Sequence, residues 1–319
     1  MDHIVPVLKP PHNIIYYLGL LYIFLSLFSF FRFLRPFFRS SPLNLLTIYG
    51  PNSYVVITGS SDGLGKSFAF AFASLGFNLV LIARNQQKLS TVKEEILAKH
   101  PKITIKIIIR DFLQSNEPEF FEKLYDELSD LDISILINNV ALDYCQEFLK
   151  TPIVEISKLM TVNLQPMVHL TYKLLPNLIA RRSKNRKSLI INISSISGLL
   201  PTPYFAIYSS TKAFMEAFTK TLIEEYKGKC EFMVVRPNFM NTNMNFNAKE
   251  DFETVNPADC VRGVMKDIGR TVVSNGDWRH HILNEIYEKI NERVVAWYYM
   301  KFMAKGVVER CEEGRKKKK

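Results

Sequence analysis

Tyr208 and Lys212 are the residues whose types and spacing most clearly suggest chemistry. They stand four positions apart in the segment Tyr-Ser-Ser-Thr-Lys. On a helix, positions i and i+4 share a face, so the phenol and the ammonium would reach the same cleft. A phenol with a pKa of about 10 is a poor acid–base catalyst at neutral pH, and an adjacent cation lowers that pKa by favouring the phenolate. The pair therefore predicts proton transfer by Tyr208, the alternative being a packed tyrosine beside a surface lysine.

A glycine-rich segment suggests a second function, the binding of a phosphate. It reads Thr-Gly-Ser-Ser-Asp-Gly-Leu-Gly over residues 58–65 and follows the apolar run Tyr54–Thr58. Glycines let the backbone approach a pyrophosphate closely, and a helix that begins there offers free N–H groups. The residues expected to line this dinucleotide site are Gly59, Ser60, Ser61, Asp62, Gly63, Leu64 and Gly65.

The elements that must position these residues can be predicted from the apolar pattern. Short β-branched runs alternate with longer amphipathic stretches, which indicates βαβ units and strands covered on both faces. The expected strands are Tyr54–Thr58, Asn78–Ile82, Ile103–Ile109, Ile133–Ile137, Ser188–Ile193 and Glu231–Val235. The expected helices include Leu64–Leu75, Gln87–Lys99 and Tyr208–Lys227. We therefore predict an α/β fold, a doubly wound parallel sheet with helices on both faces, over residues 54–280.

Three further motifs complete a recognisable set. Asn-Asn-Val-Ala (138–141) closes the fourth expected strand, Asn163 ends Met-Thr-Val-Asn, and Ser195 lies thirteen residues before Tyr208. With the TGxxxGxG loop and the YxxxK motif, they resemble the short-chain dehydrogenase/reductase family, whose fold is Rossmann-like. Ala141 stands where that family usually has glycine.

The resemblance implies hydride transfer between a nicotinamide and a carbonyl carbon. Tyr208 would protonate the carbonyl oxygen, and Ser195 would hydrogen-bond that oxygen, with Ser194 as the alternative assignment. Tyr208 and Ser195 are thus the expected substrate contacts. Lys212 would also bond the nicotinamide ribose, and Asn163 would hold a water beside Lys212. The catalytic set implied is Tyr208, Lys212, Ser195 and Asn163.

Four residues outside the glycine loop are implied to serve the cofactor. Asn139 would support the loop, Asp111 would lie beside the adenine or else cap a helix, and Thr242 would lie near the nicotinamide amide. Arg84 follows the second strand, where a carboxylate would bind a free ribose 2′-hydroxyl and a cation would bind a 2′-phosphate. With an arginine there, NADPH/NADP+ is the expected cofactor; a solvated surface residue is the alternative for Arg84.

The chain also has the loop TGSSDGLGK (58–66), NNV (138–140) in place of NNA, ISSISG (193–198) followed by YSSTKAF (208–214), an apolar segment near its start and a lysine-rich end. Together these features resemble the endoplasmic-reticulum group of the family, which holds the very-long-chain 3-oxoacyl-CoA reductases and the 17β-hydroxysteroid dehydrogenases of types 3 and 12. This resemblance implies NADPH-dependent reduction of a long-chain 3-oxoacyl-CoA in fatty-acid elongation. A ketosteroid reductase and a catalytically inactive membrane-tethered scaffold are the alternatives. Met240, Met244 and Phe246 would form an apolar substrate wall or irregular core. The six histidines show no metal-binding spacing, so no metal is expected.

The net charge of +10 first suggests an anionic partner, but most of it lies at the chain ends. Arg32, Arg35 and Arg39 carry three positive charges and residues 315–319 carry five, which leaves only +2 for the remainder. This distribution argues against nucleic acid and favours a membrane. The four cysteines are far apart, without a CxxC pair, which predicts a reducing compartment.

Both ends of the chain contribute to the membrane prediction. Residues 14–31 carry no charge and are long enough to span a bilayer, a cleaved signal peptide being the alternative. The arginines that follow place the domain on the cytosolic side. Residues 294–303 are expected to form either an interfacial helix or a helix closing over the domain. The final lysines resemble an endoplasmic-reticulum retrieval signal.

These features divide the chain into four segments. We expect an anchor segment (1–41), a connector (42–53), the catalytic domain (54–280) and a helical, lysine-rich end (281–319). The predicted location is the endoplasmic-reticulum membrane. The expected partners are a lipophilic acyl-CoA or steroid, membrane lipid, other enzymes of fatty-acid elongation and a second copy of the chain.

Overall fold

A computed structural model describes residues 12–39, 41–184, 186–246 and 248–317, and the chain falls into two units that divide after residue 40. In the first unit, helix α1 (His12–Leu34) leads into the 3₁₀ turn η1 (Arg35–Phe38). The helix is longer than the uncharged run from which it was predicted. It is long and apolar enough to be a candidate membrane span, and most of its side chains are exposed.

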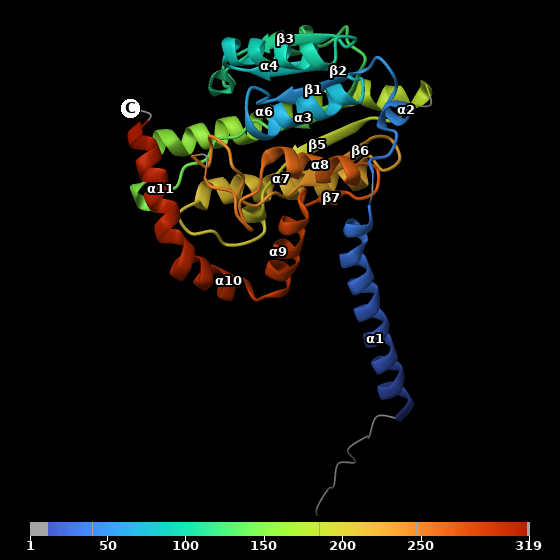
Figure 1. The fold of residues 1–319 in the computed structure, drawn as a ribbon, viewed down its shortest axis with the longest axis vertical. Helices are drawn as coiled ribbons and strands as arrows, with labels where there is room; N and C mark the ends of the chain where they lie inside the picture. The colour runs from blue at the N-terminus through green and yellow to red at the C-terminus, as the bar shows by residue number, and fades with distance from the viewer. Residues whose placement is uncertain (1–11, 40, 185, 247, 318–319) are drawn as a thin grey trace, which may run out of the picture. The chain divides into compact units, whose positions relative to one another are not determined.

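A parallel sheet of seven strands forms the centre of the second unit, in the order β3-β2-β1-β4-β5-β6-β7 (Figure 1). The strands are β1 (Tyr54–Thr58), β2 (Asn78–Ala83), β3 (Ile105–Ile109), β4 (Ile133–Asn138), β5 (Leu189–Ile193), β6 (Glu231–Val235) and β7 (Val273–Ser274). Six of them match the predicted strands to within two residues at either end. The seventh was not predicted, because its two residues are too few to form a pattern.

Helices cover both faces of the sheet, as predicted. The six are α3 (Gly63–Ser74), α4 (Gln86–Lys99), α5 (Phe120–Asp126), α6 (Ile153–Ala180), α7 (Ala206–Glu225) and α8 (Pro257–Asp267). Successive strand side chains point to opposite faces. Val55 and Ile57 accordingly pack with α3, α4 and α8, while Val56 packs with α5 and α6. Each face therefore has its own apolar core, and the fold is the doubly wound Rossmann type.

The segment expected to be a connector packs into the domain. It contains the short helix α2 (Leu45–Tyr49), whose first and last side chains are buried in the core. The Tyr49 hydroxyl also donates a 2.6 Å hydrogen bond to Glu231 at the start of β6. Residues 45–49 are thus held by the sheet and do not act as a free linker.

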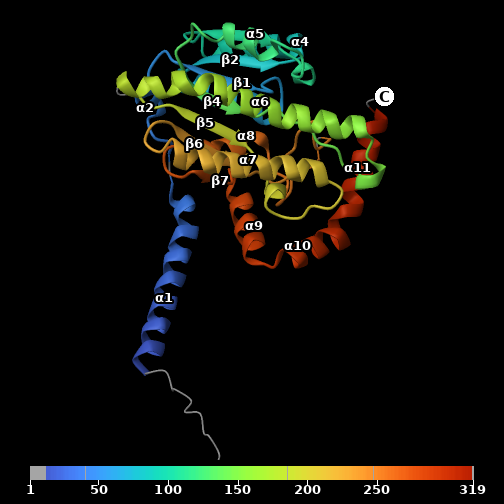
Figure 2. The same cartoon turned by 180° about the vertical axis from the view of Figure 1, so that it is seen from behind.

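Four helical elements follow the sheet: α9 (Trp278–Lys289), α10 (Glu292–Tyr298), the π-helical turn η6 (Tyr299–Met303) and α11 (Ala304–Lys317). In Figures 1 and 2, α9 runs away from the sheet, α10 lies farthest from it, and α11 returns. Val307 and Cys311 of α11 pack against Cys145 and Phe205 of the domain. Lys316 and Lys317, the expected retrieval signal, end α11. Lys318 and Lys319 lie outside the described residues, as do residues 1–11 of the predicted N-terminal tail.

Candidate active site

The glycine loop joins β1 to α3 in the geometry of a phosphate cradle. Gly59 and Gly63 have φ of +66° and +52°, in the left-handed region that side chains disfavour. A Cβ on Gly65 would lie 2.3 Å from the carbonyl oxygen of Gly59, so that position has no room for a side chain. The start of α3 provides backbone N–H groups and the positive end of the helix dipole. The residues present therefore fit the pyrophosphate of a dinucleotide.

Asn139 supports this loop, as expected from the sequence. Its Nδ2 donates to the carbonyl oxygens of Thr58 (2.8 Å) and Gly59 (3.2 Å). The Thr58 hydroxyl in turn accepts hydrogen bonds from the backbone N–H groups of Asn139 and Val140. The end of β4 thus fixes the end of β1, and Gly59 cannot leave its position without breaking these bonds.

The opposite side of the loop is covered by the segment that carries Thr242. The Thr242 methyl group lies 3.1 Å from where a Cβ of Gly63 would stand. Asp62 caps α3 through the Gly63 N–H, and its carboxylate also contacts Asn243 and, at 3.3 Å, Lys88. Burial alone would raise the pKa of Asp62, but the hydrogen bonds from Asn243 and Gly63 hold that pKa below its ordinary value.

Arg84 and Asp111 occupy the ends of β2 and β3 in different ways. Arg84 is exposed directly after β2, where a cation was predicted to bind the ribose 2′-phosphate. Asp111 accepts a 3.1 Å hydrogen bond from the N–H of Leu113 and caps the turn η2 (Phe112–Gln114). The capping alternative for Asp111 is therefore observed. The contact of Lys88 with Asp62 of the glycine loop was not predicted. The signal available in the sequence was a second cation four positions after Arg84.

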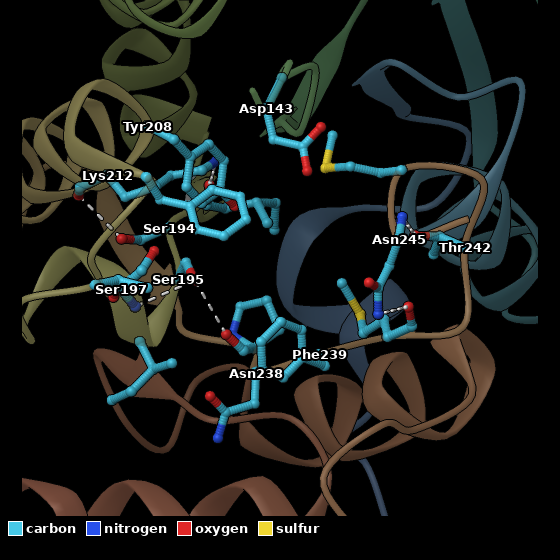
Figure 3. A pocket seen from close by; sticks show the side chains of 18 of the residues that line it. Asp143, Ser194, Ser195, Ser197, Tyr208, Lys212, Asn238, Phe239, Thr242 and Asn245 are labelled. Carbon is cyan, nitrogen blue, oxygen red and sulfur yellow. Dashed lines mark hydrogen bonds between the residues drawn. The ribbon is translucent and has the colours of Figure 1, made fainter. Parts of the chain in front are cut away.

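The catalytic candidates meet at the carboxyl end of β5. Ser195 follows this strand and hydrogen-bonds Tyr208 of α7, and its hydroxyl is also 3.5 Å from the carbonyl oxygen of Pro237 (Figure 3). The alternative residue, Ser194, is 1% exposed and donates instead to the backbone oxygen of Lys212 at 3.0 Å. Of the two serines, Ser195 is thus the one beside the phenol.

Lys212 is almost completely buried beneath Tyr208. Its Nζ donates to the carbonyl oxygen of Ile193 at 2.7 Å and lies 5.4 Å from the Tyr208 ring centre. Asn163 uses both amide hydrogens, one on Leu142 and one on Thr211, and its oxygen accepts from the Leu142 N–H. It therefore links the loop after β4 to α7. The water that Asn163 was predicted to hold beside Lys212 remains a prediction.

The electrostatics of the site differ from the expectation that Lys212 acidifies the tyrosine. Burial raises the pKa of Tyr208 above its ordinary value, Asp143 raises it further, and the hydrogen bond with Ser195 offsets part of the rise. Burial also lowers the pKa of Lys212 to about 7, against the opposing effect of Asp143. Desolvation is the largest contribution to both shifts, and it favours the neutral phenol and the neutral amine.

Tyr208 and Ser195 border a cavity of about 340 Å³ that adjoins the glycine loop. Figure 3 shows the Asp143 carboxylate on the side of this cavity facing Tyr208. Met240 and Met244 line it, as predicted, whereas Phe246 packs against Gly314 of α11. Much of the remaining wall is apolar or aromatic and was not predicted: Phe205, Phe239, Tyr287, Val295, Tyr298, Tyr299, Met303 and Val307.

Known proteins resemble this chain in sequence and in fold. It is 35% identical over 247 residues to the very-long-chain 3-oxoacyl-CoA reductase of Coccidioides immitis, covering 76% of this chain and 69% of the relative. It is 34% identical over 259 residues to the human protein of the same name, covering 80% and 79%. A short-chain dehydrogenase from Sphingobium yanoikuyae, solved with NADPH, superposes with a TM-score of 0.62 at 24% identity, covering 75% of this chain and 97% of that one.

The model of the short chain dehydrogenase family matches residues 53–253, from the start of β1 to beyond the Thr242 segment. That match contains the glycine loop, the Asn139 support and the Ser195–Tyr208–Lys212 cluster described above. With the seven-stranded sheet and the glycine cradle in the positions that a nicotinamide cofactor requires, the chain belongs to the short-chain dehydrogenase/reductase family and is an oxidoreductase.

Proposed function

We propose that this enzyme reduces a long-chain 3-oxoacyl-CoA to the 3-hydroxyacyl-CoA with NADPH. The observation that carries the proposal is the position of Tyr208, hydrogen-bonded to Ser195 at the border of an apolar cavity that adjoins the glycine loop. The relatives named as very-long-chain 3-oxoacyl-CoA reductases support the substrate class.

The residues of the site have separate roles in this reaction. Ser195 and Tyr208 hydrogen-bond the ketone oxygen, and Tyr208 gives it a proton as the carbonyl carbon receives a hydride. The hydride is the chemistry that NADPH supplies when bound. Lys212 lies behind the phenol and orients the cofactor ribose, while Asn163 fixes α7 against the loop after β4. One hydride and one proton convert the ketone to the alcohol.

The lining of the cavity indicates which part of the substrate enters it. The wall is mainly apolar and suits a fatty acyl chain. Three carboxylates also line it, those of Asp62, Asp143 and Glu253, and burial raises the pKa of Glu253. Because the apolar wall beyond the glycine loop offers phosphates little to bind, we place the nucleotide part of coenzyme A outside the cavity and only the acyl end within.

NADPH is proposed over NADH because of Arg84. An exposed guanidinium directly after β2 can bind a ribose 2′-phosphate with two parallel hydrogen bonds. Replacing Arg84 by alanine should weaken NADPH binding about 10- to 150-fold and leave NADH binding unchanged, since a charge-assisted hydrogen bond contributes roughly 1.5–3 kcal/mol. Equal effects on the two cofactors would contradict this role. The result can be measured by titrating nucleotide fluorescence.

The proposed location is the endoplasmic-reticulum membrane, with the domain facing the cytosol. The candidate span in α1, the arginines at its end and the basic residues Arg315 and Lys316 support this location. Other enzymes of fatty-acid elongation and a second copy of the chain are proposed partners on the family resemblance alone.

The test is NADPH consumption by membranes that contain the full chain. A long-chain 3-oxoacyl-CoA should be reduced, and a 17-ketosteroid should be reduced far more slowly. The Tyr208→Phe variant should bind NADPH as the wild type does and lose turnover by several orders of magnitude. Faster turnover of the steroid would favour the ketosteroid alternative. Cofactor binding without turnover of either compound would favour the inactive scaffold.

A further inference from the structure

The C-terminal helices present two different faces. From Glu292 to Lys317, α10, η6 and α11 follow one another without a break. Side chains four positions apart share a helix face. One such stripe lines the active-site cavity, and its members are Val295, Tyr299, Met303, Val307 and Cys311. This segment is therefore a wall of the cavity.

The outer face of the same segment is apolar but exposed. Trp297 is 56% exposed and Phe302 is 60% exposed, and their ring centres lie 6.0 Å apart. Met300 and Val294 of the same segment are also exposed. Ile290, at the end of α9, is also exposed. Clusters of exposed aromatic and aliphatic side chains on a protein surface often mark binding sites. We call this set of five residues the outer apolar face.

Basic side chains accompany the outer apolar face. Arg293, Lys301 and Lys305 are exposed on the same helical run. The Lys301 ammonium lies 4.8 Å from the Trp297 ring centre and 5.3 Å from that of Phe302. Tryptophan and lysine together are typical of helices that lie at the boundary between lipid acyl chains and anionic headgroups. Between residues 290 and 305, these three cations face a single exposed carboxylate, Glu292, so the local charge is positive and matches an anionic membrane surface.

The chain length brings the domain close to the bilayer that α1 would span. The domain unit begins at Ser41, and α1 ends at Leu34. Six residues of chain can extend only about 20 Å. The tether thus keeps the domain close to the bilayer, where an apolar face on the domain can meet lipid when the domain turns that face toward the membrane.

We propose that the outer apolar face docks on the lipid bilayer, with its basic side chains on anionic headgroups. This contact would place lipid directly against the wall of the cavity, where a lipophilic substrate would enter. The inference rests on the proposed membrane attachment and not on the identity of the substrate.

The two tryptophans of the chain supply a matched test. Trp278 is as exposed as Trp297, but it begins α9, where it packs against Phe252. A helix of 12 residues, about 18 Å long, separates it from the start of α10. Trp278→Phe leaves Trp297 as the fluorophore, and Trp297→Phe leaves Trp278. The anchor helix contains no tryptophan and adds no signal.

Each variant, as the full chain, is placed in bilayers of phosphatidylcholine brominated on its acyl chains, with some phosphatidylserine. Bromine should quench Trp297 several-fold more strongly than Trp278, and the Trp297 emission should be blue-shifted. Equal or absent quenching would overturn the proposal. Emission that is blue-shifted but unquenched would also overturn it, because another protein or a second copy would then cover the face.

The headgroup contact is tested by replacing Lys301 and Lys305 with alanine in the variant that keeps Trp297. Added phosphatidylserine should increase quenching in the parent and have little effect in the double replacement. The same increase in both would refute the role of the basic side chains. None of these measurements involves turnover, so a failed substrate assay and a failed docking test can be distinguished.

Discussion

Replacing Lys212 by methionine should stabilise the folded protein while abolishing its activity. The lysine is 2% exposed, and burial lowers its pKa from 10.5 to about 7. The folded state therefore binds this proton more weakly than the unfolded chain does. At every pH at which Lys212 is protonated in the unfolded chain, folding therefore costs free energy, either to bury the charged ammonium or to release its proton. Methionine fills a similar volume and removes the charge.

The size of the effect follows from the change in pKa. At about 1.4 kcal/mol for each pH unit, a fall from 10.5 to about 7 corresponds to about 5 kcal/mol as an upper limit. Methionine would also lose the 2.7 Å bond to Ile193, worth about 1 kcal/mol, and leave that oxygen unpaired at a cost of roughly 1 kcal/mol more. We expect a net gain of about 3 kcal/mol in the free energy of unfolding at pH 7.

The sign of the pH dependence provides a second readout. The folded pKa is the lower one, so the unfolded chain binds more protons between pH 7 and 10.5, and stability rises with pH across that range. Below pH 7 the penalty is complete and constant. Lys212→Met should lack this rise. Lys220→Met, an exposed position on the same helix, should keep both the rise and the activity.

The assay is unfolding of the full chain in detergent, followed by near-ultraviolet circular dichroism at several pH values from 6 to 10. Two observations together would refute the reasoning: a Lys212→Met variant no more stable than the wild type, and an unchanged pH slope in that variant. They would mean that the lysine is hydrated in the folded state and keeps an ordinary pKa.

Two other substitutions test the cofactor loop and the charge in the cavity. Gly65→Ala should weaken NADPH binding about 5- to 150-fold, because a Cβ 2.3 Å from a carbonyl oxygen forces the loop apart at a cost of roughly 1–3 kcal/mol. Gly306→Ala, with nothing within 4 Å, should bind NADPH normally in the same titration. Asp143→Asn should lower the pKa of Tyr208, so the loss of reductase activity at high pH should begin at a lower pH. An unshifted profile of kcat/KM against pH would show that Asp143 does not act on the phenol.

The sequence was sufficient to predict the fold and the strands after which the candidate site residues lie, because both follow from local patterns. The carboxyl ends of parallel strands meet at one edge of a sheet, so a motif that follows a strand is placed by the topology. The glycine loop after β1, Asn139 after β4 and Ser195 after β5 are all of this kind. Strand β7 has two residues and pairs only with β6, so it depends on the sheet already being formed.

The cavity wall could not be predicted in the same way, since it depends on where α11 returns. The fourfold spacing from Val295 to Cys311 was visible in the sequence, but which face of the segment would meet the domain was not. The alternatives of a closing helix and an interfacial helix for residues 294–303 are both compatible with the structure, because the inner face lines the cavity and the outer face is exposed. The outer role remains a proposal.

Burial acts on the two catalytic groups in a way that bears on the direction of the reaction. It raises the pKa of Tyr208 and lowers that of Lys212, so both groups are driven toward their neutral forms. A neutral phenol still has a proton to give, which the reduction of a ketone requires, whereas oxidation of an alcohol requires the phenolate as base. Asp143 strengthens this bias, because its negative charge opposes ionisation of the phenol. In the arrangement described here, Tyr208 is therefore suited to give the proton that the proposed reduction requires.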